Sequence, residues 1–142
     1  MGIAGDWYSE LGSHMRLDTD PSGAVTGTYT SALGRVSGAY PLVGRYDPPR
    51  EAAQGTALGW AVAWQNDSAD AGSVTAWSGH YRGDGTERIS ATWLLTRSAE
   101  APDTWESTVV GHDVFTREAP DPARVAQQRL ARPLPHPPGA EG

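Results

Sequence analysis

Apolar and polar residues alternate along eight short segments of the chain, which is the pattern of β-strands with one buried face. In segment 57–64, for example, Trp60, Val62 and Trp64 share one side of the expected strand, opposite small and polar residues. Turn-forming stretches rich in Gly, Pro, Asp, Asn and Ser separate the segments. No segment has a convincing 3.6-residue repeat. The pattern predicts an all-β protein with strands within residues 6–11, 14–18, 25–30, 40–46, 57–64, 73–81, 88–96 and 106–116.

Eight short strands with hairpin-length connections favour either an up-and-down antiparallel β-barrel or a β-sandwich. A chain of 142 residues suits one domain with a sizeable core. The character changes after Thr116, because residues 117–142 hold six of the eleven prolines and no aromatic residue. We therefore expect a barrel over residues 1–117 and a Pro-rich, flexible C-terminal tail over residues 118–142, in which ARVAQQRLAR could form a short helix.

Polar groups lie among the tryptophans on the face that should be buried. In the segment SVTAWSGHY, strand alternation places Ser73, Thr75 and Trp77 on the same side. A buried hydroxyl without a partner costs roughly 1–3 kcal/mol, and a buried carboxylate costs more. The inward polar groups must therefore bond to one another, to the backbone or to water, or await a ligand. The same sorting by alternation adds to this inward face Ser9, Tyr29, Ser31, Trp64, Trp93, Leu95 and Asp113.

Composition excludes several classes of function. The formal charge is −6 and all eleven basic residues are Arg, which argues against a nucleic-acid partner. No apolar run is long enough to span a bilayer, so we expect no membrane association. Because Cys is absent, we expect neither disulfides nor a thiolate metal site, and we predict no bound metal. Six Trp and five Tyr against one Phe suit a site that grips a small molecule, although small β proteins also fill their cores with Trp.

Several motifs resemble those of the avidin/streptavidin family of biotin-binding proteins, and most closely its streptavidin members. They are GDWYSELGS, TGTYTSALG, GTALGWAVAW, SVTAWSGHY and STVVGHDVFT, and the resemblance runs in order through nearly all of residues 2–117. It implies an eight-stranded antiparallel up-and-down β-barrel that binds biotin non-covalently and with high affinity in one open end. It also implies a secreted, extracellular, vitamin-binding homotetramer with no cofactor. The first residues, MGIAGDW, show no signal peptide, so a signal is either missing or already removed.

The resemblance assigns polar residues to the ureido group of biotin. Ser9, Ser13 and Tyr29 would donate hydrogen bonds to the ureido oxygen, and Ser31 and Asp113 would accept them from its N–H groups. The family usually has Asn where this chain has Ser9, so we expect biotin to be held somewhat less tightly or released faster.

The resemblance also assigns residues to the rest of the ligand. Thr75 would lie beside the ring sulfur, and Ser73 with the backbone N–H of Arg35 would bind the carboxylate. Trp105 would reach into the pocket of a neighbouring subunit. The walls of the pocket would be Trp64, Trp77, Trp93 and Leu95.

Two other functions are compatible with an inward-facing cavity. A lipocalin-like carrier of another small molecule is the main alternative, and it would favour a more uniformly apolar cavity. An enzyme could use Asp113 as a base, but no inward His and no nucleophile–base pair is evident. We therefore expect a binding protein and no catalytic residues.

Overall fold

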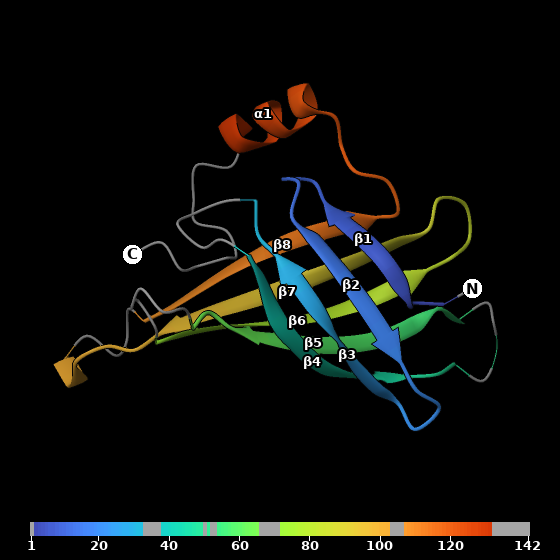
Figure 1. Cartoon of the computed structure of the whole chain (residues 1–142), viewed down its shortest axis with the longest axis horizontal. Helices are drawn as coiled ribbons and strands as arrows, with labels where there is room; N and C mark the ends of the chain where they lie inside the picture. Colours follow the sequence, from blue (N-terminus) through green and yellow to red (C-terminus); the bar gives the residue numbers. More distant parts are fainter. Residues whose placement is uncertain are drawn as a thin grey trace.

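The computed structural model describes residues 2–32, 38–49, 51, 54–65, 72–102 and 107–131. Its eight strands form one closed antiparallel barrel in which each strand pairs with the next along the chain (Figure 1). The predicted eight-stranded up-and-down barrel is therefore confirmed, and the sandwich alternative is wrong. The strands are β1 (Gly5–Ser9), β2 (His14–Thr19), β3 (Ala24–Thr30), β4 (Ala39–Asp47), β5 (Thr56–Ala63), β6 (Ser73–Arg82), β7 (Arg88–Arg97) and β8 (Thr108–Thr116).

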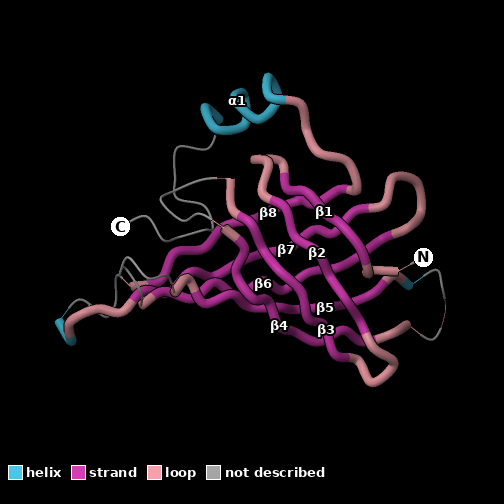
Figure 2. Tube along the Cα trace, in the orientation of Figure 1, coloured by secondary structure: helices cyan, strands magenta, loops and turns pink. Residues whose placement is uncertain are grey.

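The connections gather at the two ends of the barrel (Figure 2). The β1–β2, β3–β4, β5–β6 and β7–β8 connections lie at one end, which we call the helix end because helix α1 (Pro122–Ala131) contacts it. The opposite end carries the β2–β3, β4–β5 and β6–β7 connections and the first residues of the chain, and we call it the N-terminal end.

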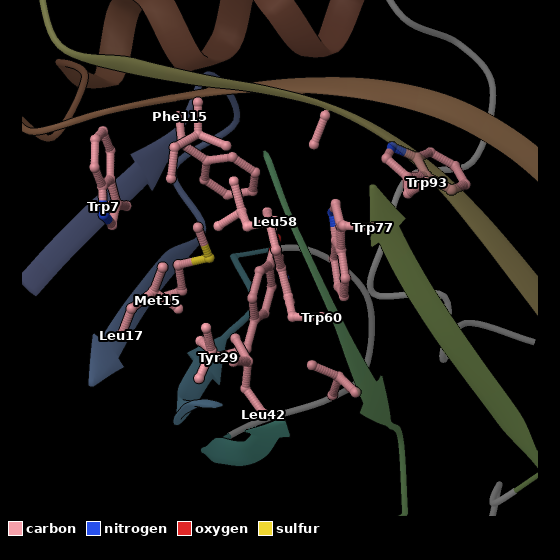
Figure 3. Packing of buried hydrophobic residues seen from close by; sticks show 14 of the residues in the cluster. Trp7, Met15, Leu17, Tyr29, Leu42, Leu58, Trp60, Trp77, Trp93 and Phe115 are labelled. Atoms are coloured by element: carbon pink, nitrogen blue, oxygen red, sulfur yellow. The ribbon is translucent and has the colours of Figure 1, made fainter. Parts of the chain in front are cut away.

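Strand alternation divides the buried interior from the outer surface as the sequence predicts. In β6, Ser73, Thr75 and Trp77 are buried while Val74 and Ala76 between them are exposed. The interior is an aromatic cluster in which the Trp60 and Trp77 rings stack with their centroids 5.4 Å apart (Figure 3). Each such buried side chain stabilises the fold by about 1.5–3 kcal/mol.

The seam between the first and last strands is short and is reinforced by one arginine. Only Tyr8↔Thr116 and Ser9↔Phe115 pair across β1 and β8. The Arg117 guanidinium lies 3.8 Å from the centroid of the Trp7 ring, and its Nη2 donates to the carbonyl oxygen of Gly2 at 2.7 Å. Cation–π attraction and charged hydrogen bonds together tie the N-terminal segment to the end of β8.

The expected C-terminal tail contains α1, in the place where the sequence allowed a short helix. Asp121 caps the helix, because its Oδ1 accepts a hydrogen bond from the backbone N–H of Arg124 at 2.9 Å. Pro122 occupies the first helical position, where its missing N–H costs nothing. Among the described residues, no helix combines the length and apolar character needed to cross a membrane. The boundary between a barrel and a tail after residue 117 stays a prediction.

Candidate functional site

The β1–β2 turn at the helix end carries two of the predicted site residues in a fixed geometry. Ser9 Oγ accepts hydrogen bonds from the backbone N–H groups of Leu11 (3.3 Å) and Ser13 (3.1 Å). Gly12 closes the turn at a φ of 92°, a conformation that favours glycine. A hydroxyl that accepts two hydrogen bonds keeps its proton for donation. Both serines are buried, so this turn can present the Ser9 proton to the barrel interior.

Tyr29 on β3 brings a second hydroxyl to the same region. Burial raises the pKa of Tyr29 well above its usual value of 10.0, and the charge of Asp113 acts in the same direction. A side-chain hydrogen bond with Ser13 acts against that rise of the Tyr29 pKa. Ser13 Oγ also accepts a hydrogen bond from the backbone N–H of Ala32 at 3.2 Å. Tyr29 therefore stays a neutral hydrogen-bond donor in the interior.

Two buried indole groups hold the polar atoms of neighbouring strands in place. The Trp77 Nε1–H donates to Asp113 Oδ2 at 3.2 Å, which links β6 to β8 across the interior. The Trp64 Nε1–H donates to Thr75 Oγ1 at 2.8 Å. Asp113 is only 3% exposed, so it needs such donors to offset its loss of hydration. Each indole thus serves both as an apolar wall and as an anchor for a polar group.

Buried polar atoms at this end without a hydrogen-bond partner among the described residues include Ser73 Oγ at the start of β6 and Trp93 Nε1 on β7. A buried polar atom in this condition costs roughly 1–3 kcal/mol, which a bound ligand could recover. Gly111 lies opposite Trp93 on β8, and a Cβ at this glycine would collide with the Trp93 ring. The absence of a side chain at residue 111 therefore makes room for the indole.

Of the remaining predicted site residues, two are described by the structure and two are not. Leu95 is fully buried two residues after Trp93, and Ser31 is half-buried just after β3 ends. Arg35 and Trp105 lie outside the described residues. No group of three or more His, Cys, Asp or Glu side chains is arranged to hold a metal in the described part of the chain. Buried aromatic rings with a few polar groups among them are the chemistry that small-molecule sites use, which makes this end of the interior the candidate site.

Comparison with known proteins identifies the barrel. A sequence model described as the avidin family matches residues 1–118. This chain belongs to the avidin family. It is 33% identical to avidin from Gallus gallus over 122 residues, which cover 81% of this chain and 77% of that protein. It is 29% identical to afifavidin from Afifella pfennigii over 118 residues, which cover 80% of this chain and 68% of that protein.

Proteins of the avidin family are biotin-binding barrels without enzymatic activity. The expectations of an avidin-type barrel and of a non-enzymatic protein are therefore confirmed at the level of the family. No cofactor is implied by this membership.

Two inward aromatic residues near the candidate site, Tyr40 and Trp60, were not among the residues assigned to the ligand from the sequence. The Tyr40 ring lies edge-on to the Trp64 ring with centroids 5.2 Å apart, and Tyr40 is buried at the start of β4. Trp60 stacks on Trp77 deeper in the interior. The sequence does indicate that both side chains point inward, because each falls on the buried side of its strand in the two-residue alternation.

A separate cavity of about 770 Å³ opens at the N-terminal end of the avidin-family barrel. None of the predicted site residues lines it. Its charged side chains already have partners, since Arg82 Nε lies 3.2 Å from Asp84 Oδ1 and Arg117 binds backbone carbonyls. The buried polar atoms without partners are not in this cavity, so we place the candidate site at the helix end.

Proposed function

We propose that this avidin-family protein binds biotin non-covalently and with high affinity inside the helix end of its barrel. The observation that carries the proposal is that Trp77 lies with its ring centroid 5.0 Å from that of Tyr29 and donates to the buried carboxyl of Asp113, while Tyr29 hydrogen-bonds with Ser13 in the same interior. A cyclic urea needs donors around its oxygen and acceptors beside its N–H groups. In the proposal, Ser9, Ser13 and Tyr29 donate to the ureido oxygen, and Asp113 and Ser31 accept from the N–H groups.

The opposite side of the pocket suits the rest of biotin. Ser73 Oγ, buried and without a partner among the described residues, would donate to the ligand carboxylate together with the backbone of Arg35. Thr75, fixed by Trp64, would lie beside the ring sulfur. Trp105 of a neighbouring subunit would complete the wall. The alternative hypothesis of a lipocalin-like carrier is weaker, because an apolar ligand would leave these buried polar groups without hydrogen-bond partners.

The strength of binding follows from where these groups lie. Hydrogen bonds to a charged group are roughly twice as strong as neutral ones, and a dry interior strengthens them further. The Ser9 side chain is shorter than the family's usual Asn, so its contact with the ureido oxygen would be the weakest of the three. We therefore expect high affinity that falls below the family's highest.

Isothermal titration of the full-length chain with biotin tests the proposal, together with thermal melting. We expect one biotin per chain and a raised melting temperature. Asp113→Ala should weaken binding by about 10-fold to 150-fold, the effect of losing a charged hydrogen bond. The matched control Asp18→Ala removes an exposed carboxylate from β2 and should bind as the parent does. If excess biotin produces no heat and no shift in melting temperature, the proposal is wrong.

An apolar row on the outer surface supports the further proposal that the protein forms a homotetramer. Val43, Ala61, Ala76, Leu94 and Val110 lie directly opposite one another, in that order, across β4 to β8. Val43 and Val110 are 61% and 62% exposed in the single chain. A continuous exposed apolar patch of this kind marks an interaction surface, and symmetric association of identical chains would cover it.

Light scattering on the purified protein tests the assembly. We expect a mass near four times the 15.1 kDa of one chain. Val110→Arg should lower that mass because it buries a charge in the interface, whereas Thr28→Arg on the outer face of β3 should not. A single-chain mass for the parent protein would exclude the homotetramer.

We also propose that the protein acts outside the cell as a vitamin-binding protein. The support is its membership of a family whose homologues are secreted. Antibody detection in the medium and in the cell fraction of the natural host would test this location.

A further inference from the structure

Helix α1 contacts the helix end of the barrel through a narrow face. Val125 and Gln128, three residues apart, are half-buried, while most of the helix is exposed and Leu130 is 85% exposed. Val125 Cγ2 lies 3.6 Å from the position that a Cβ on Gly12 would occupy, so the helix packs on the β1–β2 turn. The cartoon shows α1 beside this turn (Figure 1). The turn is the one that presents Ser9 and Ser13 to the interior.

A polar contact connects the same helix to the segment that follows β3. Arg129 Nη2 donates a hydrogen bond to the carbonyl oxygen of Ala32 at 3.2 Å. The N–H of Ala32 in turn donates to Ser13 Oγ at 3.2 Å. The carbonyl group of Ala32 is thus bound by Arg129 of the helix, and its N–H group is bound by Ser13 of the candidate site.

This chain of contacts affects where the Ser13 proton points. Ser13 Oγ accepts from Ala32 and also hydrogen-bonds with Tyr29. A serine hydroxyl has one proton and two acceptor positions. If Ala32 moved away, one acceptor position would open to water and the hydroxyl would gain freedom to rotate. The orientation of the Ser13 proton therefore depends on the position of Ala32.

We propose that Arg129 of α1 is a positioning residue for the ligand site, and that its hold on Ala32 slows the release of ligand. This inference rests on the proposed function, because the ligand whose release it slows is biotin. A helix that is mostly exposed and packs through a narrow face is weakly attached, so it can open and close without unfolding the barrel. Arg129 acts through Ala32 and Ser13 and does not itself touch the ligand.

The first experiment measures biotin release from the full-length chain by chasing labelled biotin with unlabelled biotin. Losing one hydrogen bond should accelerate release by about 2-fold to 13-fold in Arg129→Ala, with an unchanged association rate. Arg129→Lys keeps a cationic donor and should recover part of the slow release. The matched control Arg124→Ala removes an exposed arginine from the same helix and should release biotin as the parent does. Ala126→Pro, which breaks the helix interior, should release biotin at least as fast as Arg129→Ala.

The second experiment measures hydrogen exchange of the Ala32 amide without biotin, so it does not depend on the proposed function. Exchange should be faster in Arg129→Ala than in the parent and in Arg124→Ala, at an unchanged melting temperature. If biotin fails to bind the parent, the proposed function fails while the exchange result still tests the positioning role. If biotin binds but Arg129→Ala changes neither Ala32 exchange nor biotin release, the positioning role is overturned and the proposed function stands.

Discussion

Replacing Trp77 with Phe would test whether Asp113 depends on the indole N–H as well as on the bulk of the ring. Both residues are buried, and the N–H donates to Asp113 Oδ2 at 3.2 Å. Phe keeps an aromatic ring in the cluster but removes this donor from a buried carboxyl. Hydrogen bonds to charged groups contribute about 1.5–3 kcal/mol, and the smaller ring adds a packing loss.

Trp60→Phe is the matched control, because Trp60 stacks on Trp77 in the same cluster. Its buried Nε1 has no hydrogen-bond partner among the described residues, so Phe removes an unsatisfied donor. The packing loss is similar in the two variants, but only Trp77→Phe breaks a hydrogen bond. We therefore expect the free energy of unfolding to fall by at least about 2 kcal/mol more for Trp77→Phe than for Trp60→Phe.

Urea unfolding followed by far-ultraviolet circular dichroism measures this difference without relying on tryptophan fluorescence. Biotin titration of the same two variants shows whether the ligand depends on the same contact. Equal losses of stability in the two variants, or a larger loss in Trp60→Phe, would refute the idea that the indole N–H holds Asp113.

Three further perturbations test other parts of the structure. Gly111→Ala should lower stability by about 1–3 kcal/mol and weaken biotin binding, because its methyl group displaces Trp93; unchanged melting and binding would contradict this packing. Arg117→Ala should lower the melting temperature by roughly 5 °C, because it releases the N-terminal segment and Glu87; thermal melting checks this, and an unchanged melting temperature would contradict the clamp. The raised pKa of Tyr29 contributes stability that is complete below pH 10.0 and is lost as the pH rises toward the folded-state pKa. Tyr29→Phe should therefore flatten the alkaline decline in the free energy of unfolding, measured by urea unfolding at increasing pH. An equally steep decline in the variant would contradict this.

Strand alternation made most of the barrel predictable from sequence. In β7, the inward set Ile89, Ala91, Trp93 and Leu95 follows directly from a two-residue period, and all four are buried. The closure of the barrel was harder to predict, because it depends on contacts between distant parts of the chain. Arg117 binds the carbonyl oxygen of Gly2 across 115 positions, and no local pattern indicates that pairing.

The site was predictable in its residue types and less so in its contacts. Alternation places Trp60 and Trp77 on inward faces alike, yet only Trp77 reaches a carboxyl group. Which indole finds a partner depends on strand register and barrel stagger, which emerge only in the closed sheet. The contact of Arg129 with Ala32 spans 97 positions and joins the tail to the barrel, so the sequence alone gave no reason to pair them.

A crystal structure of the full-length protein grown with biotin tests directly whether the helix end is the biotin site. We expect biotin inside the helix end, with its ureido oxygen within hydrogen-bond distance of Tyr29 and a ureido N–H within hydrogen-bond distance of Asp113. Biotin bound in the cavity at the N-terminal end, or an interior at the helix end that stays without biotin at saturating concentration, would contradict it.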